Sequence, residues 1–163
     1  MLFRTDAQKR DLVASWHRPD RSFFASGACH VLTREFLHRP EANGFRPLMV
    51  VPGAGFRGGH VFASNGATVF DYHGWSKHDR FVEHFFRKIG WIFPGWRGAL
   101  VDSSLDFWTP GWFEKTNTRM PRQFHLDPTA RANAFIDRYL PARLPGAPLS
   151  DWSVGRIFLN PPC

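Results

Sequence analysis

Cysteine is scarce in this chain of 163 residues, which contains only Cys29 and Cys163. Two cysteines are too few for a disulfide-stabilised scaffold or for a structural zinc site with four thiolates. Cys163 is the last residue, where chains commonly fray. We therefore expect Cys29 to be a free thiol in a reducing environment.

Long apolar runs are also missing. No stretch approaches the ~20 apolar residues that a membrane-spanning helix needs. The first ten residues, MLFRTDAQKR, lack the apolar core of a signal peptide. We expect no membrane span, and a location in the cytoplasm or export without a recognisable signal peptide.

Basic and aromatic residues are plentiful. The net charge is +7 and the sequence pI is about 10.2, which favours an acidic partner such as nucleic acid or an acidic protein. The charges are spread along the chain, so a domain that is simply basic is an equal alternative. With 17 Phe and 7 Trp to bury, we expect one domain over 1–163.

Apolar spacing and capping signals predict four helices, over 6–16, 27–38, 77–89 and 128–140. The capping signals that begin them are Thr5 with Gln8, Ser26, Ser76 with Asp79, and Asp127 followed by Pro128. Strands are predicted at PLMVV (47–51), in a hairpin after residue 58, and at VGRIFLN (154–160) on a sheet edge. This order favours an α+β fold with a mainly antiparallel sheet.

The hairpin lies in GGHVFASNGATVFDYHG, residues 58–74. Asn65-Gly66 is a preferred pair for a two-residue type I′ turn, because both positions need a positive φ. Counting outward from that turn places His60 directly opposite Asp71. Paired residues point to the same face, so an imidazole should meet a carboxylate.

Cys29 falls in the first turn of the predicted 27–38 helix. Free N–H groups and the helix dipole favour an anion there, so the thiol pKa should fall. The Cys29 amide could also help to hold an oxyanion. With His60 as base and Asp71 as its orienting partner, Cys29 completes a nucleophilic triad.

A cysteine at a helix start, then a histidine at a strand start and an aspartate on the next strand, resembles the core of the papain-like thiol enzymes. The matching stretches are SGACHVLTREF and GGHVFASNGATVFDYHGW. Their short hairpin is closer to the compact bacterial forms, and the superfamily includes thiol proteases, amide hydrolases, glutamine deamidases and transglutaminases. The resemblance implies a papain-like core with N-terminal helices on the sheet. It also implies attack on a carboxamide or peptide bond through a thioester, without cofactor or metal. No upstream Gln matches the family's oxyanion side chain.

Other residues are expected to surround this site. Arg57 on the glycine-rich loop PGAGFRGG, together with His73 and Trp75, is assigned to substrate binding. The loop lacks a Gly-Lys-Ser/Thr ending and no helix follows it, so it is not a phosphate-binding loop. His30 either faces solvent or supports Cys29 from behind. The 77–89 helix and the aromatic C-terminal third should wall the cleft.

Two other functions remain open. A non-enzymatic module for nucleic acid or an acidic protein would use the interleaved basic and aromatic residues Arg119, Arg122, Phe124, Trp108 and Trp112. A zinc-dependent hydrolase would draw ligands from Cys29, His60, Asp71 and His73. No HExxH or CxxC spacing supports the zinc site.

Overall fold

The computed structural model describes Thr5, Gln8 and residues 10–140 of the chain. The predicted strand over 154–160 and Cys163 therefore lie outside the described residues. Within the described part, no helix is both long and apolar enough to cross a membrane.

Five strands form one antiparallel sheet in the order β4-β3-β2-β1-β5. Their bounds are β1 Arg46–Pro52, β2 His60–Ser64, β3 Thr68–Asp71, β4 Gly74–Lys77 and β5 Gly98–Asp102. The α-helices are α2 Leu12–Trp16, α3 Asp20–Ala25, α4 Cys29–Leu37, α5 His78–Ile92, α6 Pro110–Thr116 and α7 Pro128–Asp137. Two 3₁₀ turns are η1 Pro40–Ala42 and η2 Pro121–Gln123.

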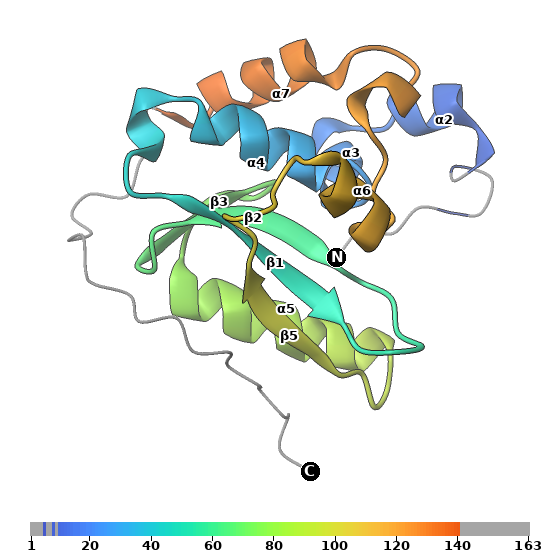
Figure 1. Cartoon of the computed structure of the whole chain (residues 1–163), viewed down its shortest axis with the longest axis vertical. Coiled ribbons are helices and arrows are strands. Elements are labelled where there is room, and N and C mark those ends of the chain that lie inside the picture. Colours follow the sequence, from blue (N-terminus) through green and yellow to red (C-terminus); the bar gives the residue numbers. More distant parts are fainter. Residues whose placement is uncertain (1–4, 6–7, 9, 141–163) are drawn as a thin grey trace.

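The sheet lies between two helical layers (Figure 1). α4 crosses one face together with the other short helices, and α5 covers the opposite face. The prediction of an α+β fold, with N-terminal helices on an antiparallel sheet, is confirmed at this level. The apolar run at 47–51 forms β1, an interior strand between β2 and β5.

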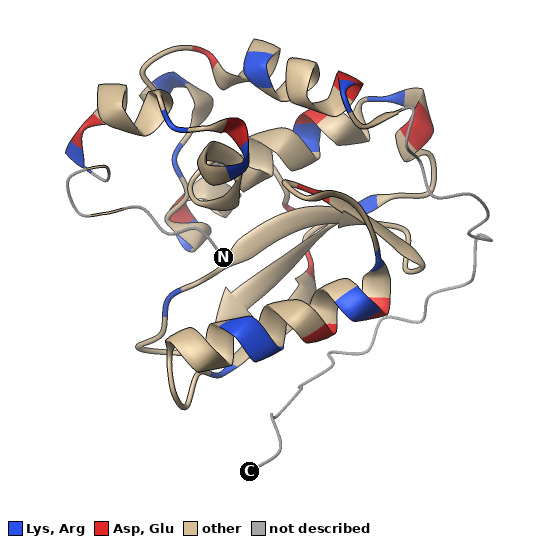
Figure 2. Ribbon diagram, turned by 180° about the vertical axis from the view of Figure 1, so that it is seen from behind, with Lys and Arg blue, Asp and Glu red and all other residues tan. Residues whose placement is uncertain are grey.

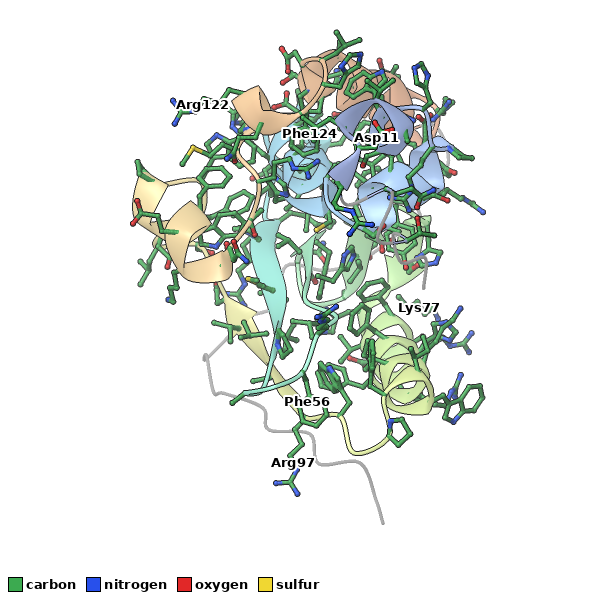
Figure 3. The ribbon with its side chains drawn as sticks, turned by 90° about the vertical axis from the view of Figure 1, so that its right-hand side faces the viewer. Asp11, Phe56, Lys77, Arg97, Arg122 and Phe124 are labelled. Carbon is green, nitrogen blue, oxygen red and sulfur yellow. The ribbon has the colours of Figure 1, made fainter. Side chains whose placement is uncertain are left out.

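Alternation along the strands supplies each layer with its own core. On the α4 face, Phe36 of α4 stacks on Phe70 of β3 with ring centroids 4.3 Å apart. On the α5 face, Phe62 of β2 packs against Phe81 of α5 at 4.7 Å. Because both faces are buried, the sheet is a rigid partition between the two layers (Figure 3).

The predicted 27–38 helix begins two residues later than expected. Cys29 is the first residue of α4 and Ala28 is its N-cap, without a side-chain cap. Ser26 is not the cap, because its hydroxyl donates to the Ser22 carbonyl and accepts from Arg18. A tertiary contact has therefore displaced the local capping signal.

The capping residues predicted for the other three helices are only partly confirmed. Thr5 and Gln8 exchange the predicted hydrogen bonds, but Asp11 interrupts the expected 6–16 helix and caps α2 through its side chain. Ser76 does not cap α5, which begins after Lys77. The prediction at Asp127 is confirmed, since its carboxylate accepts from the Thr129 N–H ahead of α7.

One charged cluster joins the N-terminal helices to α7. Arg131 of α7 donates to the Asp20 carboxylate at 2.7 Å and to the carbonyls of Trp16 and Arg18. Hydrogen bonds from Arg138 and Arg131 outweigh the effect of burial and lower the pKa of Asp20. The cluster holds the outer helices over α4.

The turn of the β2–β3 hairpin is not the predicted Asn65-Gly66 pair. The Asn65 N–H donates to the Thr68 carbonyl at 3.2 Å, so the two-residue loop is Gly66-Ala67. The Asn65 side chain accepts from the Ala67 and Thr68 N–H groups. Asn65 is therefore the first residue of the turn, and its side chain stabilises the turn. It does not have the positive φ that the predicted position would require.

The shift of the loop by one residue moves the strand register by two. Ser64 pairs with Val69, so His60 is not directly opposite Asp71 as predicted. Side chains repeat on one face every two residues, and a shift of two keeps His60 and Asp71 on the same face. The predicted contact is therefore made diagonally.

Candidate active site

Cys29 stands at the first position of α4, partly buried, above the sheet. The loop before it reaches this position through Gly27, whose φ of 123° suits glycine. Because Ala28 offers no capping side chain, the first N–H groups of α4 are left to another acceptor. The thiol and these donors lie at one helix end.

His60 and Asp71 lie where β2 and β3 separate. The described pairing of these strands stops at Ala63–Phe70. Beyond it, His60 Nε2 lies 3.2 Å from Asp71 Oδ2, with both side chains buried. A carboxylate can only accept, so Nε2 carries the proton and Nδ1 remains for a thiol proton.

The two helical layers meet where β2 and β3 separate. His60 follows the alternation of Phe62 and stacks on Phe85 of α5, with ring centroids 5.7 Å apart. Cys29 enters from the α4 layer, and the two side chains lie close enough for each to shift the pKa of the other. A continuous ladder would have kept the thiol and the imidazole on opposite sides of the sheet.

The β3–β4 turn fixes the Asp71 carboxylate. Its Oδ1 accepts from the His73 N–H at 2.8 Å, and its Oδ2 lies 3.3 Å from His73 Nδ1. Burial would raise the pKa of Asp71, but hydrogen bonds from His60 and His73 lower it. The carboxylate therefore stays charged and holds the imidazole of His60 from behind.

Cys29 and His60 stabilise each other's charged forms. Burial opposes the charge on Cys29, but the neighbouring imidazoles of His30 and His60 lower the pKa of the thiol from 9.0 to about 5. Burial also opposes the charge on His60, but the hydrogen bond to Asp71 and the proximity of Cys29 raise the pKa of the imidazole from 6.5 to about 9. Between these values the pair is a thiolate and an imidazolium.

His30 is a residue that sequence reasoning undervalued. It does not face solvent, because its side chain is 0% exposed. Its Nε2 donates to the Arg119 carbonyl at 2.9 Å. Its ring lies among Trp108, Trp112 and other aromatic rings at centroid distances of 5.6 to 6.2 Å.

The position of His30 bears directly on the thiol. Since Nε2 is occupied, Nδ1 is the remaining ring nitrogen, and it is buried with no hydrogen-bond partner among the described residues. The ring nevertheless lies near enough to Cys29 to lower the pKa of the thiol. The sequence signal was the dipeptide Cys29-His30 itself. Its meaning depended on the aromatic segment from Trp108 to Phe124, which lies far along the chain and covers the ring.

The predicted substrate-binding residues have different surroundings. His73 is exposed on the β3–β4 turn, with its side chain 42% accessible beside Asp71. Arg57 is exposed on the β1–β2 loop, where its carbonyl accepts from Trp96 Nε1. Trp75 instead donates to the Tyr139 carbonyl and packs against Phe36 in the core. These contacts give Trp75 a packing role, and its part in substrate binding stays a prediction.

The alternative functions find less support in the arrangement. Trp112 and Phe124 are buried around His30 and are not available to stack on bases. Figure 2 shows Lys and Arg distributed over several helices and loops. Across residues 10–140, no three His, Cys, Asp or Glu side chains come together in a group that could hold a metal ion.

Tyr72 also borders the site, although no role was predicted for it from the sequence. Its ring meets the His60 ring edge-on at a centroid distance of 5.2 Å. Burial and the negative charges of Asp71 and Cys29 raise the pKa of its hydroxyl above the usual range. It is a neutral hydroxyl beside the reactive pair.

The structure thus brings Cys29, His60 and Asp71 together, and their catalytic role stays a prediction. Protein-family models, curated proteins and solved structures were each compared with the chain, and none matches it.

Proposed function

We propose that the chain is a cysteine-nucleophile enzyme that acts on a carboxamide or peptide bond through a thioester. The observation that supports this most is the thiol–imidazole–carboxylate series formed by Cys29, His60 and Asp71. A buried carboxylate, a raised imidazole pKa and a lowered thiol pKa at one point are typical of an activated nucleophile and uncommon in a packing cluster.

The proposed reaction begins with addition of the Cys29 thiolate to a carbonyl carbon. The carbonyl oxygen becomes an oxyanion, and we assign its binding to the first-turn N–H groups of α4, since Ala28 provides no side-chain cap for them. The His60 imidazolium then gives its proton to the departing nitrogen, and the C–N bond breaks. This leaves an acyl thioester on Cys29 and a neutral imidazole held by Asp71.

The thioester must then be resolved by a second nucleophile. Neutral His60 can take a proton from water as it attacks, which releases a carboxylic acid and restores the thiol. With an amine in place of water, the same step transfers the acyl group. A protease, an amidase, a glutamine deamidase and an acyl transferase share the first half, and we propose a protein or peptide as the substrate.

We also propose that the core is a compact papain-like one. Its support is the order of parts: a helix that starts at the cysteine, then a strand that starts at the histidine, then a strand that ends at the aspartate. The antiparallel sheet with the cysteine helix on one face is consistent with that arrangement.

The experiment is incubation of the protein with candidate acceptor proteins and peptides, read by mass spectrometry. Conversion of a glutamine to glutamate adds about 1 Da, whereas peptide hydrolysis gives shorter chains. Cys29→Ala should abolish every such change and Cys163→Ala should abolish none. Equal loss in both variants, or full activity in Cys29→Ala, would contradict the proposal.

A further inference from the structure

A small depression lies between the β3–β4 turn and α5, on the side of the sheet away from α4. Its lining residues are Tyr72, His73, Phe81, His84, Phe85 and Lys88. Phe81 and Phe85 are buried and give it an apolar wall, while His73 and His84 are exposed at its edge. An apolar wall with polar groups at the rim suits a ligand that has one polar end.

The polar groups of the depression are mainly donors, and none of its lining residues is acidic. Lys88 supplies an ammonium group. His84 Nδ1 lies 3.4 Å from Arg87 NH2 and accepts from it, so Nε2 carries the proton and donates. His73 Nδ1 donates to Asp71, so Nε2 of the neutral ring is an acceptor at the exposed edge, and the donors are Lys88, His84 and the Tyr72 hydroxyl.

The neighbouring charges are also mostly positive. Partial burial and the positive charges of Lys88, Arg87 and His73 lower the pKa of His84. Glu83, on the same helix, is paired with Arg87 at 3.6 Å. The Asp71 carboxylate is 1% exposed and is paired with the imidazoles of His60 and His73, and its charge reaches the depression at Tyr72.

The depression directly adjoins the proposed base. The His60 ring lies 5.2 Å from the Tyr72 ring and 5.7 Å from the Phe85 ring, measured between centroids. Both of these rings line the depression. A ligand seated there would be one aromatic ring away from the imidazole that serves Cys29.

We propose that this depression is a subsite for a carboxylate on the substrate, with the stem that carries it lying on Phe81 and Phe85. The inference rests on the proposed function, since it gives that site a preference for acidic substrates. The carboxylate could belong to an acidic side chain or to a chain terminus, because both present the same group to Lys88 and His84.

The test is a binding titration on the Cys29→Ala protein, followed by NMR at the imidazoles of His73 and His84. Three probes of similar size separate the sources: acetyl-glutamate amide, acetyl-glutamine and acetyl-glutamine amide. The first has only a side-chain carboxylate, the second only a terminal carboxylate, and the third has none. Because turnover is not measured, the result does not depend on whether the chain is an enzyme.

We expect one of the two acids to bind at least about fivefold tighter than the neutral diamide at roughly 10 mM salt. Lys88→Gln should reduce that advantage to about twofold or less. The matched control is Arg122→Gln, which removes the same charge from the helical layer opposite α5 (Figure 3) and should leave the advantage intact.

Equal binding of all three probes would overturn the subsite, as would an acid preference that survives both Lys88→Gln and His84→Gln. A preference lost equally in Lys88→Gln and Arg122→Gln would show only an effect of net charge, and would overturn it too. Whichever acid binds tighter identifies the source of the carboxylate.

Discussion

Removal of the His60 imidazole should change how the reactivity of Cys29 depends on pH. In His60→Ala, the thiolate loses one of the two imidazoles that lower its pKa and the positive charge that accompanies it. Its pKa should therefore rise from about 5 toward the ordinary value of 9.0. The change is best followed in Cys163→Ala protein, where Cys29 is the single remaining thiol.

The size of the effect follows from two opposing terms. At pH 6, a thiol with a pKa of about 5 is about 90% thiolate, whereas one with a pKa of 9.0 is about 0.1% thiolate. However, nucleophilicity falls with basicity, with a Brønsted slope of about 0.45, so four pKa units make the wild-type thiolate roughly 60-fold less reactive. The wild type should thus react about tenfold faster at pH 6.

The same terms predict a crossing of the two profiles. Near pH 9 the wild-type thiol is fully ionised and the variant thiol about half ionised, and the more basic thiolate of His60→Ala should react about 30-fold faster. The crossing should fall near pH 7. His30 remains in the variant, so these factors are the upper end of the expected range.

The assay is the rate of reaction with a neutral dipyridyl disulfide from pH 4 to pH 10. His38→Ala is the control, because His38 is an exposed histidine at the other end of α4 and its removal should leave the profile unchanged. Parallel profiles for wild type and His60→Ala would refute the reasoning. A wild-type thiol that reacts only after denaturation would refute it as well.

Three further results are expected. His30→Phe keeps an aromatic ring among aromatic neighbours but removes both ring nitrogens, so the disulfide reaction at pH 6 should slow about threefold. Gly74→Ala should lower the free energy of unfolding in urea by more than about 2 kcal/mol, because its φ is +86° and the new Cβ would lie 2.5 Å from a tyrosine ring. Gly55→Ala, with a φ of +81° and open space, should cost only about 1 kcal/mol. Arg131→Met leaves the partly buried Asp20 with one fewer partner and should cost about 3 kcal/mol. Because the folded pKa of Asp20 is lowered, its stabilisation is present above pH 3.8 and is lost as pH falls, so the variant should lose less stability on acidification.

Local signals predicted the parts of the fold that depend on local chemistry. Asp127 and Pro128 begin α7 as expected, because a side-chain cap followed by a proline needs nothing from the rest of the chain. The approach of His60 to Asp71 could also be predicted, although the turn was placed one residue early. The error moved the register by two residues, which leaves His60 and Asp71 on the same face of the sheet. A shared face is the condition for contact between the imidazole and the carboxylate.

Features that depend on distant segments could not be predicted in the same way. Ser26 has the right chemistry for a cap but binds Arg18 and the Ser22 carbonyl instead. The burial of His30 depends on a carbonyl 89 residues further along the chain. Trp75 follows the histidine-bearing turn in sequence, yet its indole donates to Tyr139, from beyond the end of α7.

The carbonyl of Arg119 that holds His30 has a consequence for the order of assembly. Residues 29, 60 and 71 all leave the ribosome well before residue 119 does. A nascent chain could therefore place sulfur, imidazole and carboxylate side by side while one of the two rings beside the sulfur still turns freely. The pKa of the thiol would reach its full lowering only when the later aromatic segment packs over that ring. The thiol of the growing chain would therefore be less ionised near neutral pH than that of the finished protein.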